Sequence, residues 1–514
     1  MPNGPDSGSK GNLGEGERSA ALPRLAPMRF DELLAGAGVV RVVGDPATEI
    51  TDLGYDSRRA GPGTLFFCVP GEKVDGHDFA AQVVEAGAAA LVVERELDVA
   101  VPQAVVADAR AAMAPVAARF NGDPTGKLRV AGVTGTNGKT TTAFLLREIL
   151  EGSGTECGLL GTVKQVVGGV EEEVVRTTPE AIDLQATFRR MLDGGDRACA
   201  MEVSSHALSL HRADAIHFEL AIFTNLTQDH LDFHADMEDY FLAKRKLFAE
   251  LEPGTAIVNV DDPYGRRLAE EFGCVTFSAE GAEADYSASE VSFDAGGARF
   301  TVNGEIELRT GLPGHFNVAN ALGAFAAALA MGVSAADAAA GLAKAARVPG
   351  RFEPIDEGQG FTVLVDYAHT PDSLENALRA ARRLTAGRLI AVFGAGGDRD
   401  KDKRPKMGRA GAERSDLVIV TSDNPRSEEP AAIVAEVAAG AEAASELEVE
   451  VDRRAAIAAA LARAEPGDTV VIAGKGHEQG QEFEDGRKVP FDDREVAREE
   501  LRRLAAQGQR AGAA

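Results

Sequence analysis

The stretch from Val130 to Thr142 constrains the fold more than any other part of the chain. It reads as an apolar strand, a glycine-rich turn and the start of a helix. Such a turn directs backbone N–H groups and a helix N-terminus at one point, which suits polyphosphate. Lys139 would then reach the β- and γ-phosphates, and the Thr140 hydroxyl would face Mg²⁺. The sequence therefore predicts a strand–loop–helix unit that binds ATP or GTP.

The loop departs from the general phosphate-loop pattern GxxxxGK[ST]. The first glycine of that pattern would fall at Val133, and the nearby glycines are Gly132 and Gly135. The shorter form GTNGKTT, from Gly135 to Thr141, resembles the ATP loop of the Mur ligases and of folylpolyglutamate synthetase. An ordinary strand–turn–helix corner is the alternative, and Gly-Lys-Thr-Thr directly after an apolar strand argues against it.

Length and charge limit the classes of protein that remain. The 514 residues suffice for roughly three domains. A net charge of −27 disfavours nucleic acid and anionic membranes as partners, although local basic sites can still bind an anionic substrate. No apolar segment predicts a membrane span or a signal peptide. The four scattered cysteines lack metal-site spacing and fit a reduced, cytoplasmic protein.

Breaks in composition divide the chain into four parts. Residues 1–27 are rich in Gly, Ser, Pro and charge and resemble a disordered tail. We expect α/β domains at 28–122, at 123–348, where the phosphate loop lies, and at 349–514. In open α/β sheets the loops at the carboxyl ends of strands carry the ligands. The loops after the predicted strands 198–203 and 220–224 are therefore candidate sites.

Glu202 lies at the end of the first of these strands, and His230 lies in the loop after the second. A carboxylate in the same domain as a phosphate loop can hold Mg²⁺ directly or through water, with Thr140 as a partner, although a lone Glu at a strand end is usually a solvated charge. The second loop, from Thr224 to His234, contains two histidines and two nearby aspartates. Their spacing is not that of a zinc site, so we favour one histidine that serves Mg²⁺ or substrate.

Lys244 lies at an unexpected position in a predicted helix over 239–250. At 100° per residue, Tyr240, Phe241, Leu247 and Phe248 form one stripe with Lys244 at its centre. An inward lysine must be paired, deprotonated or modified, unless it extends along its stem to the surface. The surrounding motif resembles the Mur ligase helix that carries a carbamylated lysine. The resemblance implies that Lys244 is N6-carboxylysine and a ligand of Mg²⁺.

From about residue 28 to about residue 500 the chain resembles the diaminopimelate-adding branch of the Mur ligase family. Nine further short motifs occur in family order. They are Asp56-Ser-Arg58, Thr177-Thr-Pro179, Glu202-Val-Ser-Ser-His206, Gly314-His-Phe-Asn317, Gly350-Arg-Phe-Glu353, Asp366-Tyr-Ala-His-Thr-Pro371, Gly396-Gly-Asp-Arg-Asp400, Asp423-Asn-Pro-Arg426 and Gly474-Lys-Gly-His-Glu478. The resemblance implies three α/β domains: a UDP-substrate domain, a central ATP-binding domain with a parallel sheet and a Rossmann-like amino-acid-binding domain.

The resemblance also assigns roles to single residues. Lys139, Lys244, His230 and Glu202 would be catalytic, and Thr140, Glu202, His230 and Lys244 would hold Mg²⁺. ATP would contact Gly135, Thr136, Asn137, Gly138, Lys139, Thr140, Thr141, Asn317, Asn320, Arg351 and Asp366. The UDP-linked muramoyl dipeptide would contact Ser57, Thr177, Thr178, Ser204 and Arg212, although the threonines could instead cap the following helix.

The amino acid site would consist of Arg399, Asp423, Asn424, Pro425, Arg426, Gly474 and Glu478. Diaminopimelate differs from lysine by one carboxylate, which a planar arginine can hold in a bidentate contact. Arg426 is the arginine that lysine-adding members lack; the alternative is an arginine in a surface turn.

The resemblance implies that a substrate carboxylate takes the γ-phosphate of ATP and that the amine of meso-2,6-diaminopimelate then displaces phosphate. We expect small-molecule partners, a monomer, and neither nucleic acid nor membrane insertion. A lysine-adding ligase, folylpolyglutamate synthetase and a P-loop GTPase are the alternatives. The Asp423–Arg426 motif argues against the first two, and the lack of an Asn-Lys-x-Asp signature argues against the third.

Overall fold

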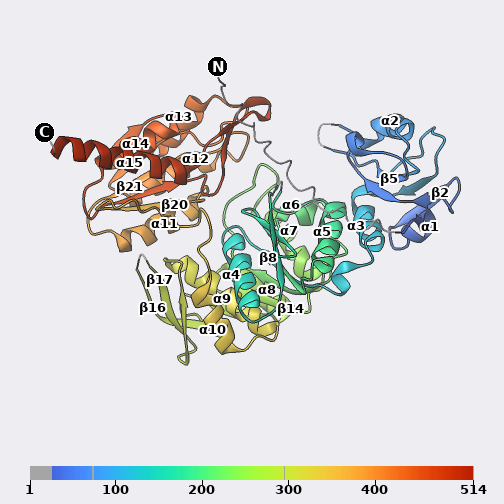
Figure 1. The fold of residues 1–514 in the computed structure, drawn as a ribbon, viewed down its shortest axis with the longest axis horizontal. Coiled ribbons are helices and arrows are strands. Elements are labelled where there is room, and N and C mark those ends of the chain that lie inside the picture. Colours follow the sequence, from blue (N-terminus) through green and yellow to red (C-terminus); the bar gives the residue numbers. More distant parts are fainter. Residues whose placement is uncertain (1–25, 72–73, 175, 295, 513–514) are drawn as a thin grey trace, which may run out of the picture.

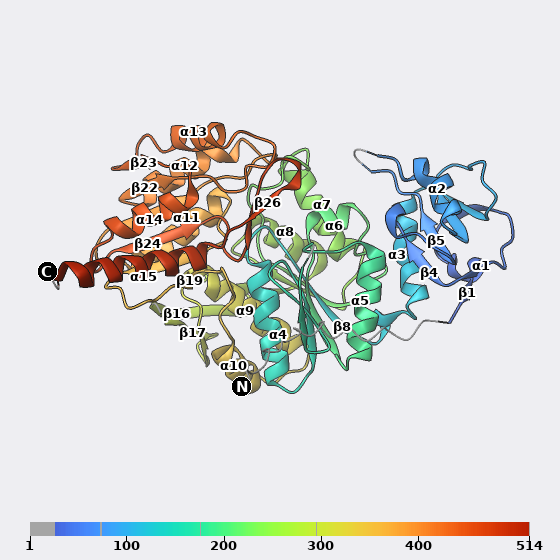
Figure 2. The same ribbon diagram turned by 45° about the horizontal axis from the view of Figure 1, so that its top comes forward.

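The computed structural model describes residues 26–71, 74–174, 176–294 and 296–512. The predicted tail lies outside them up to residue 25. Figures 1 and 2 show three lobes, each built around its own sheet, with the central lobe between the other two. The fold is therefore the predicted three-domain α/β architecture.

The first lobe contains a five-stranded sheet that is parallel except at β2. Its order is β2 (Val39–Val43), β7 (Gln103–Val106), β6 (Ala90–Val93), β5 (Thr64–Phe67) and β4 (Asp52–Gly54). Strands β1 (Met28–Arg29) and β3 (Glu49–Ile50) pair beside it. The helices are α1 (Phe30–Leu33), α2 (Ala80–Glu85) and α3 (Ala109–Phe120).

The central lobe is one eleven-stranded sheet. Its order is β11 (Val170–Glu172), β10 (Gln165–Val167), β9 (Cys157–Leu160), β12 (Ala198–Glu202), β8 (Arg129–Thr134), β13 (Phe218–Phe223), β14 (Thr255–Asn259), β15 (Val275–Ser278), β16 (Tyr286–Asp294), β17 (Gly297–Val302) and β18 (Ile306–Thr310). The helices are α4 (Lys139–Gly152), α5 (Ala181–Asp193), α6 (Ser205–Ser209), α7 (Met237–Ala249), α8 (Pro263–Phe272), α9 (His315–Ala330) and α10 (Ala335–Lys344).

The prediction of a parallel central sheet holds only for its middle. The seven middle strands, β9, β12, β8, β13, β14, β15 and β16 in sheet order, run parallel. Strands β10 and β11 at one end and β17 and β18 at the other pair antiparallel. From Glu290 to Asp294, residues of β16 alternate between exposed and partly buried positions, as in a sheet with one solvated face. The parallel strands β8, β12 and β13 place their carboxyl ends together, at the phosphate loop.

The third lobe is a six-stranded sheet covered by helices. Its order is β19 (Glu353–Pro354), β20 (Thr362–Asp366), β24 (Thr469–Ala473), β21 (Leu389–Phe393), β22 (Leu417–Val420) and β23 (Leu447–Val449), with only β19 antiparallel. Strands β25 (Gly480–Glu482) and β26 (Lys488–Pro490) form a separate hairpin. The helices are α11 (Pro371–Leu384), α12 (Lys403–Arg414), α13 (Pro430–Gly440), α14 (Arg453–Arg463) and α15 (Asp493–Gly512).

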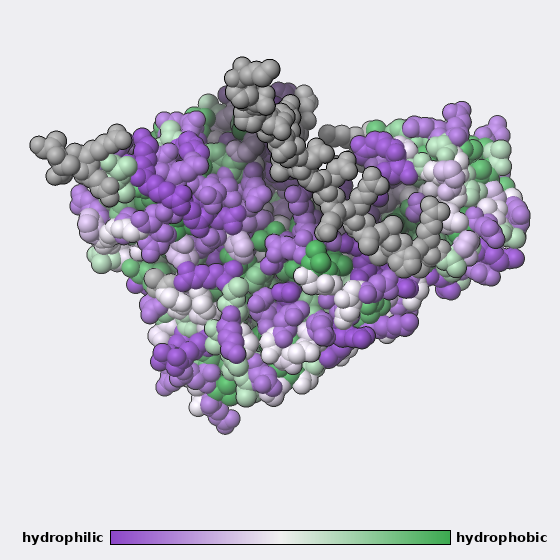
Figure 3. Space-filling view, viewed as in Figure 1, coloured by the Kyte–Doolittle hydropathy of each residue, from purple (hydrophilic) through white to green (hydrophobic). Residues whose placement is uncertain are grey.

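Hydrogen bonds join the lobes. Asn137 Nδ2 donates to Asp372 Oδ2 at 3.0 Å between the central and third lobes, and Tyr55 Oη donates to Asp183 Oδ2 at 2.5 Å between the first and central lobes. The face drawn in Figure 3 is mostly hydrophilic, with small scattered hydrophobic areas. Among the helices in the described ranges, none has both the length and the apolar character needed to cross a membrane.

Candidate active site

The phosphate loop connects the end of β8 at Thr134 to the start of α4 at Lys139. Gly135 has φ 147°, and a Cβ atom there would lie 1.9 Å from Thr224 Oγ1. That hydroxyl donates to Asn137 O at 2.6 Å. Because Thr224 follows β13, the neighbouring strand braces the loop, and position 135 has no room for a side chain. The predicted strand–loop–helix unit is present.

Two lysines approach the same carbonyl oxygen of this loop. Lys139 Nζ donates to Gly135 O at 3.0 Å and to Thr136 O at 2.8 Å. Lys244 Nζ donates to Gly135 O at 2.8 Å and lies 4.6 Å from the centre of the Tyr240 ring. Lys244 is 1% exposed, which confirms its predicted inward position on α7. Burial, with the neighbouring Lys139 as the second cause, holds the pKa of Lys244 well below its usual value.

Glu202 ends β12 and lies in the wall of the main cavity. It is 1% exposed, its Oε1 accepts from Thr162 N at 2.6 Å, and its Oε2 accepts from Thr162 Oγ1 at 3.1 Å. No cationic side chain of the described residues forms an ion pair with it. A buried carboxylate with only neutral partners, facing a cavity, fits a cation ligand. Thr162 was not predicted as a site residue, because no motif in the surrounding sequence indicates such a role.

His230 lies in the loop after β13 and lines the same cavity as Glu202. Its backbone has φ 55°, and its Nε2 lies 3.3 Å from Asp229 Oδ2. Burial lowers the pKa of His230 to about 3, so the ring is neutral and retains a nitrogen lone pair that can bind a metal ion. Nowhere in the described ranges do three or more His, Cys, Asp or Glu side chains form a metal-binding group. Mg²⁺ would therefore need oxygens from the nucleotide as well.

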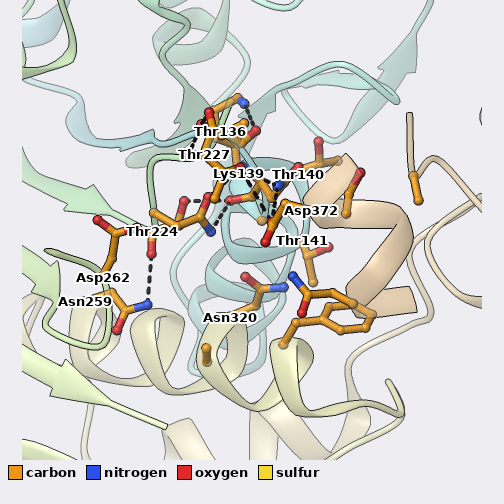
Figure 4. Close-up of a pocket in the computed structure, with 18 of the residues that line it drawn as sticks. Thr136, Lys139, Thr140, Thr141, Thr224, Thr227, Asn259, Asp262, Asn320 and Asp372 are labelled. Carbon is orange, nitrogen blue, oxygen red and sulfur yellow. Dashed lines mark hydrogen bonds between the residues drawn. The ribbon is translucent and has the colours of Figure 1, made fainter. Parts of the chain in front are cut away.

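A cavity of about 1050 Å³ joins the phosphate loop to the third lobe. Figure 4 shows Lys139, Thr140 and Asp372 near one another, with Asn320 of α9 below them. Among the predicted site residues, the cavity is lined by Thr136, Asn137, Gly138, Lys139, Thr140, Thr141, Thr177, Thr178, Glu202, Ser204, Arg212, His230, Asn320, Arg351 and Asp366. The structure thus brings together most residues of the predicted nucleotide and peptide sites.

The nucleotide-site residues of the third lobe reach into this cavity. Arg351 Nη2 donates to Thr140 Oγ1 at 3.0 Å, and its guanidinium lies 4.3 Å from the centre of the Tyr367 ring. Asp366 accepts from Phe352 N at 2.6 Å, and burial raises the pKa of its carboxyl. Asn317 lies behind Asn320 and accepts from its Nδ2 at 3.1 Å, so it supports the cavity wall without lining it.

The predicted peptide-binding residues form one wall. Thr178 Oγ1 donates to Glu202 O at 3.0 Å and does not cap α5, whose N-cap residue is Glu180. Arg212 Nη2 lies 2.9 Å from Glu180 Oε1, and Ser204 caps α6 through Ala207 N. Arg212 therefore already holds one carboxylate. Thr177 Oγ1 lies 3.0 Å from Thr162 Oγ1, and Ser57, in the 3₁₀ turn Ser57–Arg59 of the first lobe, is not among the lining residues.

The predicted amino acid site lies outside the main cavity, at the carboxyl ends of β21, β22 and β24. Arg426 is in a turn with φ 52°, as predicted, and is about one-fifth exposed. Its Nε donates to Glu482 Oε2 at 3.1 Å, and its Nη1 donates to Gly397 O at 2.7 Å. For Nη2 the described residues offer no hydrogen-bond partner. Glu482 was not predicted, because β25 is 56 residues away in sequence.

The other members of this site surround Arg426. Asn424 Nδ2 donates to Glu478 Oε2 at 2.8 Å, and Pro425 joins Asn424 to Arg426. Gly474 has φ 124°, and a Cβ atom there would lie 2.4 Å from Asp423 Oδ2. Arg399 is half exposed, and its Nη1 lies 3.8 Å from Asp232 Oδ2 of the central lobe. All seven predicted residues are thus near one edge of the sheet.

The structure also identifies charged residues between the lobes that sequence reasoning missed. The Asp229 carboxylate lies 3.6 Å from Lys403 Nζ and 3.9 Å from His369 Nε2. Burial opposes ionisation of Asp229, but His230, Lys403 and His369 together lower its pKa. The only sequence signal for Asp229 was its position next to His230. The loop that carries His230 therefore contacts α12, which follows Arg399.

Comparisons with known proteins cover all three lobes. Family models described as "Mur ligase family, catalytic domain", "Mur ligase middle domain" and "Mur ligase, glutamate ligase domain" match residues 49–122, 133–328 and 350–476. The UDP-N-acetylmuramoyl-L-alanyl-D-glutamate–2,6-diaminopimelate ligase of Streptomyces coelicolor is 48% identical over 93% of this chain and 97% of its own length. The ligase of that name from Geobacillus thermodenitrificans is 47% identical over 88% and 94%.

Solved structures agree with these matches. A structure of a UDP-N-acetylmuramoyl-L-alanyl-D-glutamate–2,6-diaminopimelate ligase aligns with a TM-score of 0.67 at 32% identity, over 93% of this chain and all of that one. MurF from Acinetobacter baumannii aligns with a TM-score of 0.66 at 24% identity, over 88% of this chain and 96% of that one. The second likeness concerns the fold alone.

Proposed function

The chain belongs to the Mur ligase family, and we propose that it is an ATP-dependent ligase that adds meso-2,6-diaminopimelate to UDP-N-acetylmuramoyl-L-alanyl-D-glutamate in peptidoglycan synthesis. The choice of amino acid rests on Arg426, which presents a guanidinium beside Asn424 at the carboxyl end of β22. Its Nη2 is available to a carboxylate. Lysine has no second carboxylate for this group to bind.

The reaction begins with the phosphoryl transfer. An oxygen of the peptide carboxylate attacks the γ-phosphorus of ATP, the bond to the β-phosphate oxygen breaks, and ADP leaves with that electron pair. Lys139 supplies positive charge beside the phosphates from the cavity wall. Thr140, Glu202 and His230 would hold Mg²⁺, which offsets charge on the phosphoryl oxygens when bound.

In the second step the amine of diaminopimelate attacks the carbonyl carbon of the acyl phosphate. The tetrahedral intermediate collapses to the amide, inorganic phosphate leaves, and the nitrogen loses a proton. The hydrogen bonds from Asn137 to Asp372 and from Arg351 to Thr140 connect the central and third lobes beside the cavity. Closure would exclude the water that would otherwise hydrolyse the acyl phosphate.

We also propose that Lys244 is carbamylated. A lowered pKa favours the neutral amine, whose nitrogen can attack CO₂, form an N–C bond and release a proton. The product is an anion near His230 and Lys139 and would be a further ligand of Mg²⁺. The ammonium form of Lys244 is disfavoured by the charge of Lys139, whereas a carbamate at the same place would attract Lys139, which supports the assignment.

We propose domains at residues 28–122, 123–348 and 349–514. We also propose that the protein is a monomer, which a molar mass from light scattering would test. A cytoplasmic location is supported by four free cysteines, Cys68, Cys157, Cys199 and Cys274, since such thiols suit a reducing compartment.

The test of the function is a panel of amino acids with a mass readout. The protein is incubated with the UDP-muramoyl dipeptide, ATP and Mg²⁺, and with diaminopimelate, lysine or glutamate in separate reactions. We expect ADP release and a product heavier by one diaminopimelate less one water in the first reaction only. Product formation with lysine at an equal rate would refute the assignment, and GTP in place of ATP serves as the nucleotide control.

A further inference from the structure

Lys475 is a fully buried lysine in the floor of the amino acid site. It follows β24 in the loop that contains Gly474 and Glu478, and its side chain is 0% exposed. Its Nζ donates to Asn424 Oδ1 at 2.8 Å and to Glu478 Oε2 at 2.9 Å, and it lies 3.9 Å from Asp423 Oδ1. All three partners belong to the proposed diaminopimelate site.

The contacts of Lys475 fix the orientation of the Asn424 amide. Asn424 Oδ1 also accepts from Glu482 N at 3.0 Å, so two donors face this atom and it must be the oxygen. The nitrogen then faces Glu478 Oε2, which can only accept when ionised. Without the ammonium group of Lys475, Asn424 Oδ1 would keep only one of the two donors that hold the amide in this orientation.

The same contacts determine what the site offers to a ligand. Glu478 Oε2 is occupied by Lys475 and Asn424, and within the described chain no partner is found for Oε1. One N–H of Asn424 and the Nη2 of Arg426 remain as donors. The two donors would bind the carboxylate of one α-amino acid end of diaminopimelate, and the Glu478 oxygen would accept from the ammonium group of the same end.

Electrostatics supports a positioning role. Burial alone would raise the pKa of the Asp423 carboxyl, but Lys475 and Arg453 lower it below its usual value. Removal of Lys475 would leave Asp423 and Glu478 as neighbouring carboxylates with less compensating charge, so they would repel each other. Glu478 could relieve this repulsion by turning away from the site.

We propose that Lys475 is a positioning residue that sets the donor and acceptor polarity of the amino acid site; this rests on the proposed function. Lys475 does not reach the substrate itself, because it is enclosed by Asp423, Asn424 and Glu478. It acts by holding Asn424 as a donor and Glu478 as an acceptor toward the ligand.

The test compares the Lys475→Met variant with the wild type in the complete reaction. Methionine retains most of the apolar stem and lacks the ammonium group. We expect the KM for diaminopimelate to rise by about 10- to 100-fold, because charge-assisted hydrogen bonds are lost, with the KM for ATP and for the UDP-linked peptide within about twofold. Arg388→Met, which removes an ion pair with Asp468 at the opposite edge of the same sheet, is the matched control and should leave the KM for diaminopimelate unchanged.

Chemical rescue separates positioning from a general structural role. In Lys475→Ala, added propylammonium should restore part of the affinity for diaminopimelate, whereas propanol should not. An unchanged KM in Lys475→Met, or an equal rise for all three substrates, would overturn the inference. If that variant fails to fold, Lys475→Gln is measured instead, and failure of both to fold would assign Lys475 a structural role. Inactivity of the wild type with diaminopimelate would instead refute the proposed function.

Discussion

Alanine in place of Lys244 should lower the turnover number by about 100- to 1000-fold in a protein that stays folded. In the proposed mechanism this side chain is a buried anion near His230 and Lys139. Alanine removes that anion and leaves a space on the inner face of α7. Formate or acetate should enter this space and restore part of the turnover, because a carboxylate can replace the carbamate group.

Lys246→Ala is the matched control for this prediction. Lys246 lies on the same helix, is only partly buried and points away from the phosphate loop. Its replacement should leave turnover within about twofold, as is usual for surface changes. ¹³C NMR after exchange with labelled bicarbonate tests the modification directly. Full activity in protein that shows no carbamate carbon, or no rescue of Lys244→Ala by carboxylates, would contradict the assignment.

Arg426→Ala should raise the KM for diaminopimelate on the order of 100-fold, since it removes one partner of a charge pair at a partly buried site. The KM for ATP should not change, because Arg426 lies outside the main cavity. Alanine at this position adopts the same positive φ as arginine, so the backbone cost is similar for both. The effect should therefore report the guanidinium.

Two comparisons sharpen this experiment. Arg426→Lys retains the charge and loses the planar donor pair, so it should be intermediate. Arg414→Ala removes a surface ion pair with Glu375 in the same lobe and should leave the KM for diaminopimelate unchanged. Steady-state kinetics with each substrate varied in turn provides the readout. An unaltered KM for diaminopimelate in Arg426→Ala would show that the carboxylate is bound elsewhere.

Local patterns predicted much of this structure. Helical periodicity placed Lys244 at the centre of the hydrophobic stripe of α7, and the resemblance to the Mur ligase helix favoured an inward side chain over one that extends to the surface. The strand–loop–helix at Gly135 to Thr140 followed from glycine placement. The prediction of a parallel central sheet was only partly right, since β10 and β11 have only three residues each and are too short to show whether they pair parallel or antiparallel.

Contacts between distant segments could not be read from sequence. Glu482 reaches Arg426, and Thr162 reaches Glu202, only because the sheets bring their loops together. Lys475 lies in a glycine-rich motif where a lysine usually indicates a surface charge, and only its burial reveals its partners. The separation of the amino acid site from the main cavity is likewise a property of the folded chain.

The most direct test of the account follows oxygen from the peptide to phosphate. The UDP-linked dipeptide is labelled with ¹⁸O in its reacting carboxylate and is converted with ATP and diaminopimelate, and the inorganic phosphate is then analysed by mass spectrometry. Transfer of the γ-phosphate to a carboxylate oxygen predicts one ¹⁸O atom in each phosphate released. Phosphate without ¹⁸O, formed together with the amide product, would contradict an acyl phosphate and with it the central claim.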